Sequence, residues 1–332
     1  MNTLHLQEGQ VFKSYKALCE EIGETPKKTK EKKERHYEVF RQYFDFEHVT
    51  TQKIKITKVH KKGDFKNTYS TRSKYVNEIS ILILNELNKN NGELFVTMKQ
   101  LMDICGMITE VYGQDSVKQD IVRSMSDNPQ KESICINSIF YQMNNKISDM
   151  IYRCLDRLKK QEIIEYDKKT YIISENGKEI ATSSMENMIE ELEKLVLKEY
   201  SCNSLQHVII KGKYKSFFDE VRKLLKEKHN IYNYYKVVKI KIICVSNNVP
   251  QYTQQEVTQA KARLQEITYT SVLDLLTKRK ENHDMKSKGI KHSNMNDSEF
   301  TENYMDFARI LTVKFIKSPD QPTISISKLR NK

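Results

Sequence analysis

The chain has 332 residues, which is enough for two or three domains of ordinary size. Its 56 Lys and Arg residues exceed its 44 Asp and Glu residues, and the net charge of +12, with a pI near 9.1, favours polyanionic partners. No apolar run reaches the roughly 18 residues that a membrane span needs, and the polar N-terminal residues form no signal-peptide core. We therefore expect a cytoplasmic protein without a membrane partner.

A first small unit is predicted over residues 1–62. Ser14 is placed to cap a helix, and Gly23 is placed to end it. The inward stripe of this helix consists of Tyr15, Leu18, Cys19 and Ile22. A second helix is expected over residues 30–43, and the alternating runs that follow it predict a hairpin. Helix, turn, helix, hairpin is the order of a helix-turn-helix with a wing.

The turn and the second helix of this unit carry a dense basic cluster. Its members are Lys27, Lys28, Lys30, Lys32, Lys33 and Arg35. Such a cluster is either a solvated helix face or a contact to nucleic acid, and we interpret it as a DNA contact. Residues 12–23, with the Lys-rich stretch and the strand residues after them, resemble a short N-terminal module in proteins of phages and plasmids from Gram-positive bacteria. The resemblance is limited to this first unit and implies no particular site residues.

A polar linker is expected over residues 61–71, and a second unit over residues 72–180. This unit begins with a helix, a short strand and a helix capped by Thr97. Another helix with a strongly apolar stripe leads directly into two β-rich runs around a polar turn at residues 167–169. A helix followed at once by a short hairpin resembles the winged-helix variant of the helix-turn-helix family.

The resemblance implies that this helix enters the major groove and that the wing touches the DNA backbone. The first turn of the helix would then present Asn144, Asn145, Lys146 and Ser148. Its outward face would present Arg153 and Arg157, and the tip of the hairpin would present Lys168 and Lys169. Winged-helix units also serve as protein-binding modules, so this second interpretation stays open.

One stretch departs from the winged-helix pattern. Residues 107–143 separate the second helix of this unit from the proposed recognition helix, where the usual connection has only a few residues. Either these residues form an insertion with its own structure, or part of residues 133–143 belongs to an extended third helix.

The rest of the chain is predicted in three segments. A connecting or dimerising helix is expected over residues 185–200, and a second α+β domain, which could be winged, over residues 201–292 with a long helix from residue 254. Residues 293–332 are expected to form a helix, a strand near residues 312–316 and a basic tail. The predicted fold class is α+β, mostly helical, with tandem helix-turn-helix or winged-helix units and short β-hairpins.

The sequence contains no pattern typical of catalysis. It has no glycine-rich phosphate loop, and none of its six cysteines forms a Cys-x-x-Cys pair or a zinc spacing with histidine. We expect no enzyme activity, no cofactor and no metal. The leading hypothesis is a sequence-specific double-stranded DNA-binding protein of a mobile element, acting as a replication initiator or a transcriptional regulator. Host replication or transcription proteins and a second copy of the chain are further candidate partners.

The alternative hypothesis is an adaptor that captures a host protein through winged-helix scaffolds. The two hypotheses differ in salt dependence, because phosphate contacts release counterions and DNA affinity therefore falls steeply as salt rises.

Overall fold

The computed structural model describes residues 6–27, 29–41, 43–50, 53–59, 74–125, 128–243, 250–289 and 296–317. Within these ranges the chain is α+β and mostly helical, as the sequence predicts. The described strands form one antiparallel sheet of three strands and another of four. No helix in the described part is long and apolar enough to cross a membrane. The predicted linker and the predicted basic tail beyond residue 317 lie outside these ranges.

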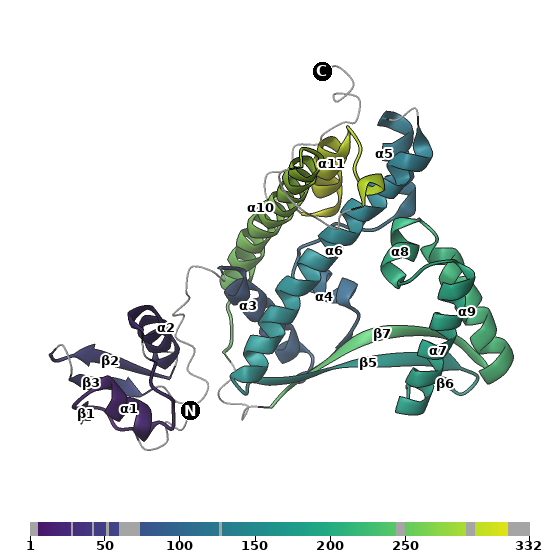
Figure 1. The fold of residues 1–332 in the computed structure, drawn as a ribbon. Coiled ribbons are helices and arrows are strands. Elements are labelled where there is room, and N and C mark those ends of the chain that lie inside the picture. Colours follow the sequence, from purple (N-terminus) through teal and green to yellow (C-terminus); the bar gives the residue numbers. More distant parts are fainter. Residues whose placement is uncertain are drawn as a thin grey trace.

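The N-terminal unit has the order helix, turn, helix, hairpin that the sequence predicts (Figure 1). Its elements are β1 (Val11–Phe12), α1 (Tyr15–Glu21), α2 (Lys30–Phe40), β2 (Phe44–His48) and β3 (Ile54–Val59). The Ser14 hydroxyl accepts a hydrogen bond from the Ala17 amide and caps α1, while Gly23 has a φ of 71° just beyond the helix. The predicted stripe of α1 is buried in a core of its own with residues of α2 and the sheet.

A larger core, called the main core here, gathers helices from both ends of the remaining chain. Its helices are α3 (Lys74–Lys89), α4 (Met98–Ile104), α5 (Asp115–Met125), α6 (Pro129–Lys160), α10 (Gln254–Ser287) and α11 (Tyr304–Phe315). The helices α4 and α10 each begin with a capping box, formed by Thr97 with Gln100 and by Thr253 with Glu256. The short helix η3 (Asp297–Glu299) precedes α11.

The four-stranded sheet joins the main core to a third, smaller core. Its strands are β4 (Glu93–Val96), β5 (Ile164–Ser174), β6 (Gly177–Ile180) and β7 (Ile231–Ile242), in the order β4-β7-β5-β6. Figure 1 shows β5 and β7 as long paired strands that run from the foot of α6 to the neighbourhood of α7 (Ser183–Glu199) and α9 (Tyr214–His229). One end of this pair contributes to the main core, and the other end packs with α7, α8 (Leu205–Ile210) and α9 in the small core.

The two sheets share one strand order. In the N-terminal unit the strand before the helices, β1, pairs with the last strand, β3, which pairs with β2. In the larger part, β4 precedes α4 and α6 and pairs with β7, which pairs with β5. The larger part has two insertions in this order, namely α5 between the two helices and residues 175–230 between the two long strands, and it adds α3 before the order and α10, η3 and α11 after it.

The structure corrects several expectations about this larger part. Residues 167–169 are not a hairpin turn, because they lie inside β5 and pair with residues 237–239 of β7. The helix before them is a single helix beginning at Pro129, which agrees with the extended-helix alternative for residues 133–143. No strand forms over residues 312–316, since α11 continues to Phe315 and only Ile316 bridges to Ile108.

The cores also divide the chain differently from the predicted boundaries. The sequence predicts one unit ending at residue 180 and another over residues 201–292. In the structure, however, α10 and α11 bury their apolar faces with α3 and α6. The predicted connecting helix, α7, instead buries Ile189, Leu192 and Val196 in the small core.

Candidate nucleic-acid interface

The N-terminal unit gathers basic residues around Tyr15. The Tyr15 hydroxyl accepts a hydrogen bond of 3.1 Å from the Lys27 amide, and Lys33 Nζ lies 5.6 Å from the centre of the Tyr15 ring. Lys32, which neighbours Lys33 on α2, is exposed. The structure therefore brings Lys27, Lys32 and Lys33 to the turn and the start of α2. Lys28 and the side chains of Lys30 and Arg35 lie outside the described part.

A buried histidine holds the turn between α1 and α2 in place. His36 Nδ1 lies 2.6 Å from the Tyr15 hydroxyl, and His36 Nε2 lies 3.5 Å from Glu24 Oε2. Burial lowers the pKa of His36, and the nearby positive charge of Lys27 lowers it further. The neutral imidazole thus links α2 both to α1 and to the turn that carries Lys27.

The hairpin of the N-terminal unit adds basic residues that the sequence analysis did not single out. Lys53 and Lys58 are exposed on β3 or directly before it, and Lys55 pairs with Glu47 across the hairpin at 3.5 Å. The sequence does indicate that Lys53 and Lys55 face outward, because they alternate with Ile54 and Ile56 and these two isoleucines are buried. Helix, turn and hairpin of this unit all carry lysines.

The residues expected at the start of a recognition helix lie elsewhere. Asn144, Asn145, Lys146 and Ser148 are half-buried near the middle of α6, so the expectation that they form its first turn is wrong. The side chain of Asn144 accepts a hydrogen bond of 3.2 Å from the Tyr112 hydroxyl, inside the larger part of the protein.

The other residues predicted in this unit lie on α6 and on β5, where Lys168 and Lys169 face opposite sides of the sheet. Arg153 is exposed and Arg157 is half-buried on α6. Lys168 and Lys169 lie in the middle of β5 and not at a hairpin tip. Lys168 Nζ lies 4.0 Å from the centre of the Tyr152 ring, so the structure does bring Lys168 against α6.

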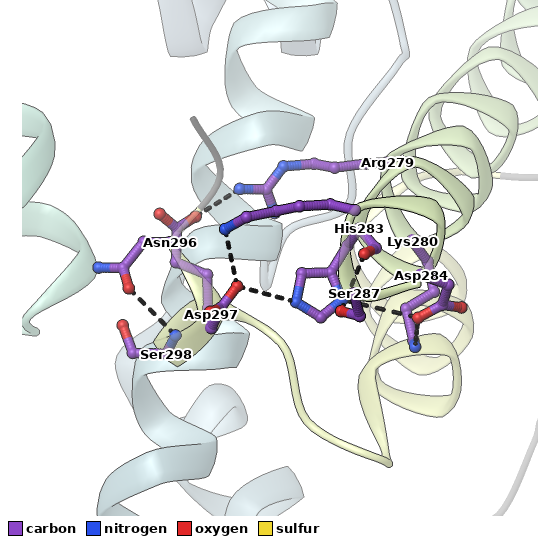
Figure 2. Close-up of polar contacts among 10 residues, drawn as sticks. Arg279, Lys280, His283, Asp284, Ser287, Asn296, Asp297 and Ser298 are labelled. Carbon is purple, nitrogen blue, oxygen red and sulfur yellow. Dashed lines mark hydrogen bonds and ion pairs between the residues drawn. The ribbon is translucent and has the colours of Figure 1, made fainter. Parts of the chain in front are cut away.

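A polar network connects α10 to η3 (Figure 2), and Ser138 links it to α6. Arg279 forms an ion pair with Glu299, and the Ser138 hydroxyl donates a hydrogen bond to the same carboxylate. His283 Nε2 lies 3.3 Å from Asp297 Oδ1. The side chains of Arg279 and Glu299 are only 10% and 11% exposed, so this part of the network joins helices inside the protein and does not face a partner.

The part of the chain that the structure describes contains neither a candidate metal site nor a reactive thiol. Among the described residues, no group of three or more His, Cys, Asp or Glu side chains could hold a metal ion. The cysteines Cys19, Cys105, Cys135, Cys154 and Cys202 are free and buried. Burial raises the pKa of the Cys135 thiol to about 11, so this thiol is held in its unreactive form.

Comparison with known proteins adds no family. No protein-family model, no curated protein and no solved structure matches the chain.

Proposed function

We propose that the protein binds double-stranded DNA through its N-terminal unit. The observation that carries the proposal is that Lys27, Lys32 and Lys33 lie together on a unit with the order helix, turn, helix, hairpin. His36 holds the turn between the two helices in place. A helix-turn-helix presents its second helix to the major groove, and lysines beside that helix meet the phosphates. The exposed Lys53 lies at the end of the hairpin loop, in the place of a wing contact.

The larger part supports the same proposal more weakly. Its strand order repeats that of the N-terminal unit, and α6 carries the exposed Arg153 directly after Tyr152, whose ring contacts Lys168. A cytoplasmic protein of a mobile element, which initiates replication or regulates transcription without chemistry of its own, is the role that we assign to this architecture. Two DNA contacts on one chain would add their binding through a high effective concentration.

Salt-dependent binding by charge variants tests the proposal. The full chain with Lys27→Ala, Lys32→Ala and Lys33→Ala is compared with the unchanged chain on one duplex, after a genome-wide footprint has identified a bound site. Each lost phosphate contact reduces the slope of log affinity against log salt by about 1, so the triple variant should lose about 3. Lys16→Ala is the matched control, because Lys16 is an exposed lysine on α1 that pairs with Glu20.

The outcomes separate DNA binding from the adaptor hypothesis. A shallower slope in the triple variant alone supports the proposal. Equal slopes in the triple variant, the control and the unchanged chain would refute the N-terminal DNA contact. Absence of any salt-dependent duplex binding by the unchanged chain would favour the protein-binding adaptor instead.

A further inference from the structure

The four-stranded sheet has an outward face that carries aromatic side chains and is partly covered by α4 and the segment after it. Strand register places Phe95, Tyr171, Tyr235 and Lys239 on this face, because Tyr171 pairs with Tyr235 and Phe95 pairs with Lys239. The opposite face carries Leu94 and the other buried residues of the main core. An outward face with three aromatic rings is unusual for a sheet that has a solvated side.

The three rings form a continuous row across the strands. The centres of Phe95 and Tyr171 are 6.2 Å apart, and those of Tyr171 and Tyr235 are 5.9 Å apart. Phe95 is 38% exposed, while the two tyrosines are half-buried. Val237, which lies between them on the same face, is buried. The three rings belong to neither core; Phe95 is exposed and the two tyrosines are partly accessible.

Lysine ammonium groups lie directly over these rings. Lys178 Nζ lies 4.4 Å from the centre of the Tyr171 ring and 5.3 Å from that of Tyr235. Lys239 Nζ lies 4.8 Å from the centre of the Phe95 ring. Lys169 precedes Tyr171 by two residues and so shares its face. Aromatic rings interleaved with lysines provide both stacking surfaces and positive charge.

The charge on this face is divided along the strands. Toward one end the carboxylates Glu93, Glu165 and Asp167 lie beside Lys239 and Lys241, and Glu93 pairs with Lys239 at 3.0 Å. Lys169 and Lys178 lie toward the other end, around the two tyrosines. The tyrosine end is therefore basic and attracts a polyanion, whereas the charges at the other end largely cancel.

A pocket opens beside this row of rings. It has a volume of about 860 Å³, and its lining includes Phe95, Tyr235 and Lys178 from the sheet and Lys99 and Asp103 from α4. Aromatic, cationic and carboxylate groups in one hollow match the face and the polar edge of a nucleobase.

We propose that this face binds single-stranded DNA, with bases stacked on Tyr171, Tyr235 and Phe95 and phosphates held by Lys169, Lys178 and Lys239. Single strands expose the faces of their bases, whereas a duplex hides them, so a row of rings selects the single strand. A contact between an exposed ammonium group and a ring is weaker than base stacking, so an arriving base displaces Lys178 from the rings and leaves its charge for a phosphate. The choice of DNA over RNA rests on the proposed function, while the site itself does not.

The experiment measures binding of a labelled oligothymidine to the full chain by fluorescence anisotropy. The test variant combines Tyr171→Ala and Tyr235→Ala, and the control variant combines Tyr171→Phe and Tyr235→Phe, which keeps both rings. We expect the alanine variant to lose about tenfold or more in affinity for each ring, and the phenylalanine variant to stay within about threefold of the unchanged chain. An oligouridine of the same length separates DNA from RNA.

A direct optical readout is available because the chain contains no tryptophan. Phe95→Trp places a single indole in the row of rings, and stacking of a base on it should quench its fluorescence as oligothymidine is added. The second control adds Lys27→Ala, Lys32→Ala and Lys33→Ala to the Phe95→Trp protein. This protein should lose affinity for duplex DNA and should still show quenching by oligothymidine. Failure of the duplex proposal and failure of the single-strand proposal can therefore be told apart.

Three results would overturn the proposal. They are equal oligothymidine affinity of the alanine and phenylalanine variants, an unquenched indole at saturating oligothymidine, and stronger binding of oligouridine than of oligothymidine. If the alanine variant does not fold, as shown by loss of cooperative thermal unfolding in that variant alone, the quenching experiment decides the question. The protein used for quenching keeps both tyrosines.

Discussion

Removing Glu299 should destabilise the protein strongly, because it leaves Arg279 charged and without its main partner inside the structure. Both side chains are close to nine-tenths buried, and Glu299 also accepts a hydrogen bond from Ser138. Breaking a buried ion pair by removing one partner costs about 3–5 kcal/mol. In a domain of about 150–250 residues, a loss of 1 kcal/mol lowers the melting temperature by about 2–4 °C. Glu299→Ala should therefore lower the melting temperature by about 6–20 °C.

The double variant Arg279→Met with Glu299→Leu separates burial of charge from loss of packing. Replacing both partners by apolar side chains is often close to neutral, so this variant should recover at least half of the loss. Thermal unfolding of the full chain, followed by circular dichroism, measures all three proteins, and Glu302→Ala is the exposed control on the neighbouring segment. The reasoning is wrong if Glu299→Ala melts within about 2 °C of the unchanged chain, or if the double variant is less stable than the single one.

Three further predictions concern other parts of the fold. The lowered pKa of His36 means that the unfolded chain takes up the proton first, so the amide protection factors of α1 and α2, corrected for the intrinsic exchange rate at each pH, should fall as pH falls below 6.5. This loss of protection should vanish in His36→Asn, and its persistence there would assign it to another group. Leu264→Ala, in a fully buried position of α10, should cost about 2–5 kcal/mol in urea unfolding, whereas an effect below about 1 kcal/mol would mean that the site collapses without a cavity. Thr253→Ala removes the cap of α10 and should cost about 1 kcal/mol, and Thr253→Ser should restore most of it.

Elements set by local sequence could be predicted, and the N-terminal unit shows why. The cap at Ser14, the stripe of α1 and the turn at Gly23 depend on residues within a few positions of one another. The basic cluster of residues 27–35 could be predicted for the same reason, because its members are close together in the sequence. The stripe of α6 also extends upstream through Ile136, Ile139 and Met143, which are all buried at helical spacing, so its full length was present in the sequence.

The hairpin at residues 167–169 was wrong for a physical reason. Residues 167–169 of β5 pair with residues 237–239 of β7, about seventy positions away, and no local pattern records that pairing. The polar triplet Asp167, Lys168 and Lys169 lies in the stretch of β5 between the main core and the small core. Asp167 and Lys168 are exposed there, so polar residues are tolerated in mid-strand. The aromatic row could not be predicted either, because its rings come from β4, β5 and β7.

The position of β7 has a consequence for how the protein is made. This strand is the last of the four in the chain, yet it lies between β4 and β5 and joins them. A chain emerging from the ribosome therefore holds β4 and β5 with open edges until residue 242 has been synthesised, and unpaired strand edges invite pairing with other chains. Folding of the larger part must wait for its C-terminal third, whereas the N-terminal unit is complete once β3 has emerged.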